Sequence, residues 1–237
     1  MPTSDGLVAA LPTAIDFPPD WTAPSSGPST DPGPASGPRK GFCGGGDAET
    51  RAVAAGMVAY GALPAFVSPD GIYVEVRLYG FPTVDAASSF LTTTVADSAA
   101  CPGGFSYQLP EGAGDGTYSG LGDEAAVAAG VVWSFVEQLE AVTDPVAGTD
   151  QTVRVTWRTE YSTVYADTGY GYTGTRILQF ERHGAIVAGI VSSAWNAPFG
   201  FSTTGFVPHD LTADETASLA DLLRPGIVGR LRSAGLI

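Results

Sequence analysis

The sequence predicts an α+β fold, in which helices pack mainly on one face of an antiparallel β-sheet that follows a linker rich in Pro, Gly and Ser. Two patterns predict it. Residues 71–79 and 153–165 alternate between apolar and polar side chains, as strands with one buried face do. Residues 212–231 carry apolar side chains at helical spacing. With 237 residues, of which 44% are hydrophobic, the chain is long enough to bury a substantial core.

The N-terminal part divides into two segments ahead of the main domain. Residues 1–21 contain a short helix that ends at Pro12 and an extended segment that Trp21 anchors. Residues 22–42 are rich in Pro, Gly and Ser and are predicted to form a linker. We therefore expect a single α+β domain over residues 43–237.

The first part of that domain is predicted to form strands on either side of one helix. Residues 51–60 fit a helix or a strand; as a strand they would pair with 71–79 across a long loop containing Pro64. Thr83 is the expected N-cap of a helix that ends at Cys101, and a short strand over 105–109 follows.

The second part of the domain is predicted to form further strands, including a hairpin, and a C-terminal helix. Residues 125–136 fit either a buried strand or a helix. Strand 153–165 precedes a hairpin that turns at His183-Gly184, and the second arm of this hairpin is apolar on both faces, as in a central strand under helices. Thr212 and Glu215 have the spacing of a capping box, and Pro225-Gly226 is expected to divide the final helix in two.

The charge excludes two classes of partner. The chain has 11 basic and 25 acidic side chains, for a formal net charge of −14. Nucleic acids and anionic membrane surfaces both select clustered Lys and Arg, so neither is an expected partner. No uninterrupted apolar run approaches the ~20 residues that a membrane-spanning helix needs, so no membrane span is expected.

The two cysteines bear on the compartment. Residues 1–5 lack the basic and apolar regions of a secretory signal peptide, so the protein is either cytosolic or has a leader that is absent from these residues. Cys43 lies in a glycine-rich stretch, where a lone thiol would be exposed. We therefore favour a Cys43–Cys101 disulfide and an extracellular or cell-envelope location over the alternative of two unrelated buried thiols.

Catalytic motifs are absent from the sequence. The two histidines, His183 and His209, have no Cys or second His at ligand spacing, so neither a metal nor a cofactor is expected. No nucleophile elbow or phosphate-binding loop is present. A hydrolase would have to use a carboxylate pair such as Glu137 with Glu140, or Asp123-Glu124. We therefore expect a protein that is not an enzyme.

Two surfaces are candidates for binding. One is a polar sheet face on which Arg77, Arg154 and Arg158 would lie; cross-strand ion pairing is the alternative. Because Arg176 and Arg182 also fall on predicted strands, this face can be locally basic and accept an anionic small ligand. The other surface is aromatic, since Tyr and Trp on Gly-punctuated segments suit binding surfaces, although the same rings would also suit the core. Its candidate binding residues are Tyr161, Tyr170, Tyr172 and Trp195.

Several short motifs together resemble one known family. They are residues 11–16 with Trp21, a helix that closes on Cys101, Gly120-Leu121-Gly122-Asp123-Glu124-Ala125, the Arg182-His183-Gly184 hairpin and the final helix. In this order they resemble the extracytoplasmic sensor-type domain of actinobacteria, which occurs in secreted lipoproteins and as the PknH-type outer domain of membrane Ser/Thr kinases. This chain departs from the kinase version, which has two disulfides, because its two cysteines can form only one.

The resemblance implies a non-catalytic cell-envelope domain that binds or senses an unidentified ligand, and it transfers no site residues. The partner would be a small molecule, a lipid, a glycan or an envelope protein. The alternatives are an envelope hydrolase that uses a carboxylate pair and a protein-interaction module that uses the aromatic loops.

Overall fold

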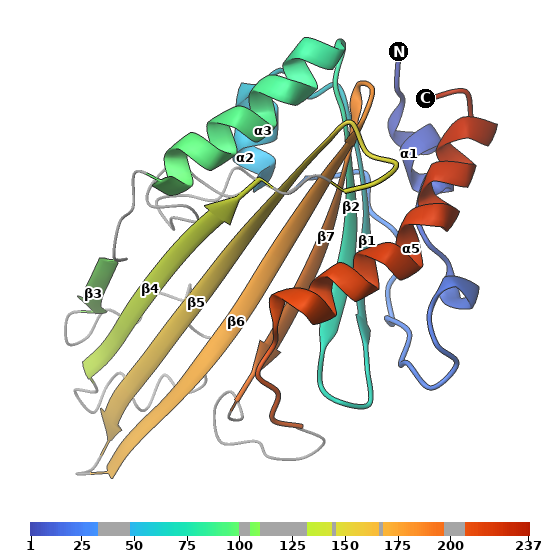
Figure 1. The fold of residues 1–237 in the computed structure, drawn as a ribbon. Coiled ribbons are helices and arrows are strands. Elements are labelled where there is room, and N and C mark those ends of the chain that lie inside the picture. The colour runs from blue at the N-terminus through green and yellow to red at the C-terminus, as the bar shows by residue number, and fades with distance from the viewer. Residues whose placement is uncertain (33–47, 100–104, 110–131, 144–145, 166–167, 197–206) are drawn as a thin grey trace.

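The computed structural model describes residues 1–32, 48–99, 105–109, 132–143, 146–165, 168–196 and 207–237 (Figure 1). These residues contain one seven-stranded antiparallel sheet in the order β1-β2-β7-β6-β5-β4-β3. The strands are β1 (Ala59–Val67), β2 (Tyr73–Gly80), β3 (Phe105–Leu109), β4 (Val132–Val142), β5 (Gln151–Tyr165), β6 (Thr168–His183) and β7 (Ile186–Trp195). The helices are α1 (Ser4–Ala10), the short 3-10 helix η1 (Ala14–Asp16), α2 (Ala48–Ala54), α3 (Val84–Ala99) and α5 (Ala213–Ser233). The predicted α+β class with an antiparallel sheet is confirmed.

The helices are divided between the two faces of the sheet, whereas the sequence predicted most of them on one face. Val76 and Leu78 of β2 belong to a core that includes residues of α1 and α5. Tyr79, the next residue of the strand, belongs to a second core that includes residues of α2 and α3. Because β7 is buried and largely apolar on both faces, each face must be covered. The prediction that β7 is a central strand is confirmed.

The segment around residues 51–60 combines both structures that the sequence allowed. Helix α2 ends at Ala54, and β1 begins at Ala59 and pairs with β2. Pro64 lies inside β1, not in a loop as predicted. The register of the β1–β2 pair shifts between Leu63 and Phe66, and β1 is an edge strand. A register irregularity and an edge strand each tolerate a proline, because the missing N–H of the proline interrupts no regular hydrogen-bond ladder there.

The N-terminal residues lie against the sheet. Leu7 and Phe17 are buried in the α5-side core, and the Phe17 ring stacks on Phe66 with 3.9 Å between centroids. Backbone bridges from Thr22 and Ser29 contact the outer edge of β1. The described start of the predicted linker thus lies along the sheet, and its residues 33–42 lie outside the described part.

Helix α5 is one continuous element, although Pro225-Gly226 was expected to break it. Leu223, Ile227 and Leu231 on its buried side are each 0–1% exposed. Burying each of these side chains contributes about 2 kcal/mol, which together exceeds the ~3 kcal/mol cost of an interior proline. The capping box that begins α5 is confirmed, because the Glu215 amide donates to Thr212 Oγ1 at 3.2 Å and the Thr212 amide donates to Glu215 Oε2 at 2.8 Å.

Three other predictions are confirmed. Thr83 caps α3, since its Oγ1 accepts from the amide of Ala86 at 3.1 Å, and the strand over 105–109 is β3. The β6–β7 hairpin is present, but its turn residues are Gly184 and Ala185, one residue later than the predicted His183-Gly184, and Gly184 has φ 60°. In the described part of the chain, no helix has the length and hydrophobicity that crossing a membrane requires.

Candidate ligand-binding site

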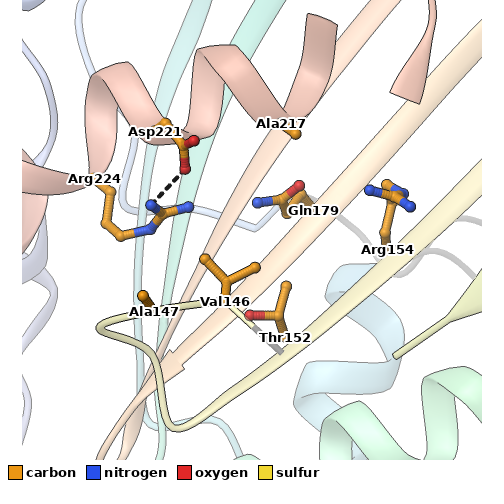
Figure 2. Close-up of a pocket in the computed structure, with 8 residues that line it drawn as sticks. All are labelled: Val146, Ala147, Thr152, Arg154, Gln179, Ala217, Asp221 and Arg224. Atoms are coloured by element: carbon orange, nitrogen blue, oxygen red, sulfur yellow. Dashed lines mark hydrogen bonds and ion pairs between the residues drawn. The ribbon is translucent and has the colours of Figure 1, made fainter. Parts of the chain in front are cut away.

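A cavity of about 400 Å³ lies between α5 and the β5–β6 part of the sheet. Its wall combines apolar side chains with two arginines, an aspartate and a glutamine (Figure 2). The residues that line it are Val146, Ala147, Thr152, Arg154, Gln179, Ala217, Asp221 and Arg224. Arg154 was predicted from the sequence as a binding residue. A volume of this size can hold a small metabolite.

Strand register explains why polar residues meet here. Arg154 lies directly opposite Gln179, and Thr152 lies directly opposite Glu181, on the neighbouring strands β5 and β6. Residues two apart on a strand share a face, so all four face the same side of the sheet. On this side the apolar core extends from β1 to Ile177 of β6. The cavity therefore begins where the apolar core ends.

One wall of the cavity is a buried ion pair. Arg224 donates from Nε and Nη2 to the two oxygens of Glu181, at 2.7 and 2.6 Å, and from Nη1 to Asp221 Oδ1 at 2.6 Å. The side chain of Glu181 is 1% exposed and that of Arg224 is 14% exposed. These charge-assisted bonds raise the pKa of Arg224 although burial opposes it. This pair holds the middle of α5 against β6.

A histidine lies behind the same carboxylate. His183 is buried, and its Nε2 is 3.9 Å from Glu181 Oε2. Among the residues that the structure describes, none forms a hydrogen bond with this nitrogen. Burial lowers the pKa of His183; Arg224 and Arg232 lower it as well, whereas Glu181 and Asp150 oppose the change.

The predicted arginines do not form a single basic face. Arg154 and Arg158 lie on the α5 side of β5, and Arg158 is exposed and lies outside the cavity wall. Arg77 and Arg176 lie on the opposite face. Each is two residues before a member of the α2-side core on the same strand, Tyr79 and Leu178, and residues two apart share a face. The predicted strands are not neighbours either, since β7 and β6 separate β2 from β5.

Arg77 belongs to a buried polar cluster on the α2 side. Its Nη1 donates to Glu49 Oε1 at 2.7 Å and its Nη2 donates to Glu75 Oε2 at 2.5 Å. The hydroxyl of Tyr79 also donates to Glu49 Oε1, at 2.8 Å. Burial and the nearby Glu49 raise the pKa of Tyr79. In this cluster Arg77 joins α2 to the sheet.

The predicted aromatic residues lie on β5, β6 and β7, and those on β5 and β6 are at the end of these strands away from His183. The backbone places residue 161 opposite 172 and residue 163 opposite 170. Trp195 lies opposite Gly174, and a Cβ on that glycine would collide with the Trp195 ring. The structure thus brings the aromatic positions near one another but away from the cavity.

The two carboxylate pairs considered for a hydrolase lie in different parts of the chain, one on strand β4 and one outside the described residues. Residues 137 and 140 lie on strand β4, where an odd separation places them on opposite faces, so the helical pairing considered for a hydrolase does not occur. Asp123-Glu124 and both cysteines lie outside the described residues. Within the part of the chain that the structure describes, no group of three His, Cys, Asp or Glu residues could hold a metal ion.

Sequence reasoning missed most of the cavity wall. Gln179 and Glu181 were visible only as polar residues that alternate with the apolar Leu178 and Phe180, a pattern typical of any strand with one polar face. Asp221 and Arg224 have ion-pair spacing on the last helix. Nothing in the sequence showed that this helix crosses β6 at those two residues.

Comparison with known proteins gives a distant structural likeness. No protein-family model matches the chain, and no curated protein matches it. Among solved structures, the chain is similar to the extracellular domain of PknH from Mycobacterium tuberculosis. The two share 12% identity over 96% of this chain and 97% of that chain, with a TM-score of 0.46. This neighbour is the kind of outer domain that the sequence motifs resemble. A likeness at this level identifies neither a ligand nor site residues.

Proposed function

We propose that this chain is a non-catalytic binding domain of the cell envelope that takes a small polar molecule in the cavity under α5. The observation that supports it is the cavity itself, about 400 Å³ in volume, with charged and amide groups in an otherwise apolar wall. Binding sites for small molecules combine these features, because apolar walls supply affinity and a few polar groups orient the ligand.

The extracytoplasmic location is supported by the sequence motifs and by the expected Cys43–Cys101 disulfide. Its test is intact-mass analysis of protein from its native host after alkylation without reduction. We expect no alkylated cysteine, because a disulfide leaves no thiol to react. Two alkylated cysteines would contradict the location and leave the cavity proposal unaffected.

The binding role is tested by filling the cavity. A library of small polar metabolites is screened by thermal shift, and hits are measured by calorimetry on the wild type and on Ala217→Trp. We expect binding to be lost in Ala217→Trp, because the indole would occupy the space between α5 and β6. Ser218→Trp is the matched control, because Ser218 is the next residue of α5 and is exposed. Hits that bind Ala217→Trp as tightly as the wild type would contradict the proposal.

The same samples distinguish the alternative functions. Mass spectrometry of each bound ligand after prolonged incubation would detect the products of a hydrolase, and any turnover would contradict a non-catalytic role. A protein-interaction module would instead form a complex that survives gel filtration and depends on Trp195. A complex of that kind, formed equally by Ala217→Trp, would favour the aromatic surface over the cavity.

A further inference from the structure

We infer that the cavity under α5 takes a neutral polyhydroxyl ligand, such as a monosaccharide or a cyclitol, and that one of its hydroxyl groups donates to Gln179 Oε1. This inference rests on the proposed function and adds the chemical class of the ligand. Two features of the molecule support it, the fixed orientation of the buried Gln179 amide and the apolar side chains in the cavity wall.

Glu181 fixes the orientation of the Gln179 amide. Gln179 Nε2 donates to Glu181 Oε1 at 2.7 Å, and the two residues are 2% and 1% exposed. Because a carboxylate only accepts hydrogen bonds, the amide nitrogen must face Glu181, and the reversed amide would place two acceptors against each other. Gln179 Oε1 is therefore held on the other branch of the amide, where it can act only as an acceptor.

This oxygen of Gln179 faces the cavity. In Figure 2 the amide nitrogen points toward Arg224, whereas the oxygen points away from Arg224 and toward Ala217 of α5. Among the residues that the structure describes, none donates a hydrogen bond to this oxygen. A buried acceptor without a donor is unfavourable. A ligand that enters the cavity therefore gains affinity by bringing a hydrogen-bond donor to Gln179 Oε1.

A neutral donor fits this position better than a cationic one. Glu181 is already compensated, because Arg224 Nε and Nη2 donate to its two oxygens at 2.7 and 2.6 Å. An ammonium group at Gln179 Oε1 would lose its water without gaining a carboxylate of its own, and a buried charge in that state is strongly unfavourable. A hydroxyl group is far less costly to bury and makes the same hydrogen bond.

Apolar side chains in the wall suit the carbon ring of such a ligand. Val146 and Ala147 come from the segment before β5, and Ala217 comes from α5 (Figure 2). The hydroxyl of Thr152, which also lies in the wall, is hydrogen-bonded to that of Thr149 at 2.9 Å. The C–H groups of a sugar or cyclitol ring can pack against these side chains, as ligands do in sites that combine apolar walls with a few polar groups.

Asp221 supplies a second acceptor from the other side of the cavity. Its Oδ1 accepts from Arg224 at 2.6 Å, and its side chain is 67% exposed, so Oδ2 can accept from a ligand. Because Asp221 lies on α5 and Gln179 lies on β6, a ligand that donates to both needs at least two hydroxyl groups. This requirement favours a polyol over a simple alcohol.

The experiment measures the binding of myo-inositol, glucose and glucosamine to the full chain by calorimetry. Glucosamine matches glucose in size and replaces one hydroxyl by an ammonium group. We expect saturable binding of myo-inositol or glucose. We expect glucosamine to bind no more tightly than glucose, because its ammonium group gains no carboxylate beside Gln179.

A variant and a spectroscopic readout locate the hydrogen bond. Gln179→Met keeps a similar shape but offers no strong acceptor, so it should weaken polyol binding about three- to tenfold. Thr175→Val is the matched control, because it removes a hydroxyl from the same face of β6 outside the cavity wall. In heteronuclear NMR spectra of the wild type, the side-chain amide resonance of Gln179 should shift when the polyol is added. This readout does not depend on the folding of any variant.

The outcomes separate this inference from the proposed function. Polyol binding that is as tight in Gln179→Met as in the wild type would overturn the polyol inference, and so would an unshifted Gln179 amide in the complex. Tighter binding of glucosamine than of glucose, or no binding of either polyol, would overturn it as well. In each case the metabolite library and the Ala217→Trp variant decide independently whether the cavity binds ligands. Polyol binding that persists in Ala217→Trp would overturn both.

Discussion

Because Arg224 and Glu181 form a buried ion pair, we expect that replacing Arg224 alone destabilises the protein much more than replacing both residues by neutral ones. In Arg224→Met, a carboxylate that is 1% exposed loses its charged partner. Removing one member of a buried pair costs about 3–5 kcal/mol, because the remaining charge is neither hydrated nor compensated. The second contact of Arg224 adds little, since Asp221 is 67% exposed and such pairs contribute about 0–1 kcal/mol.

The assay is urea unfolding followed by circular dichroism, with thermal unfolding as a second measurement. A domain of this size loses about 2–4 °C per kcal/mol, so we expect the thermal midpoint of Arg224→Met to fall by about 6–20 °C. The double variant Arg224→Met/Glu181→Gln should recover at least half of the loss, because a neutral amide can stay buried beside Gln179. Arg158→Met, at an exposed arginine, should change the free energy of unfolding by less than about 0.5 kcal/mol.

Either of two results would contradict a charge-based role for Arg224. A loss below about 1 kcal/mol in Arg224→Met would mean that Glu181 is compensated in another way. A double variant as unstable as the single one would mean that the packing of the Arg224 side chain, rather than its charge, holds α5 to the sheet.

Three further predictions concern other contacts. Burial lowers the pKa of His183, so the neutral side chain contributes stability that is present above the unfolded pKa of about 6.5 and is lost as the pH falls below it. In urea unfolding between pH 8 and pH 5, His183→Leu should lose less free energy of unfolding than the wild type. Parallel pH curves for the two proteins would contradict this. Pro225→Ala should raise the free energy of unfolding, because α5 is continuous and the alanine restores a backbone donor. A destabilised variant in the same assay would instead show that the helix depends on the proline. Gly174→Ala should lower the free energy of unfolding by about 1–3 kcal/mol, because its Cβ would collide with the Trp195 ring. The same substitution in a Trp195→Ala background should have a smaller effect. An equal effect in both backgrounds would contradict the contact.

Local patterns in the sequence were sufficient for most of the elements. The strand over 153–165, the Thr83 cap, the β6–β7 hairpin and the capping box of α5 each depend on residues close together in the chain, and all are present. Predictions failed where distant contacts compete with a local preference. Pro225 does not end α5, because the helix buries Ile227 and Leu231 in the core below it.

The candidate site shows the same division. Arg154 was identified because an arginine in an alternating strand is recognisable, and Arg77 was identified for the same reason. The sequence could not distinguish the two, since the order of the strands decides which face and which neighbours each arginine has. In the fold, Arg77 joins a buried cluster with Glu49, whereas Arg154 lines a cavity.

By itself the sequence determined the α+β class, the acidic composition and the absence of a recognisable catalytic motif. Only the tertiary structure decided that β7 lies between β2 and β6, that helices cover both faces, and that α5 crosses β6 at Asp221 and Arg224. The reason is physical. Periodicity records which side chains are buried, but the partner of a buried charge is chosen by packing between segments far apart in the chain, as Glu181 and Arg224 are.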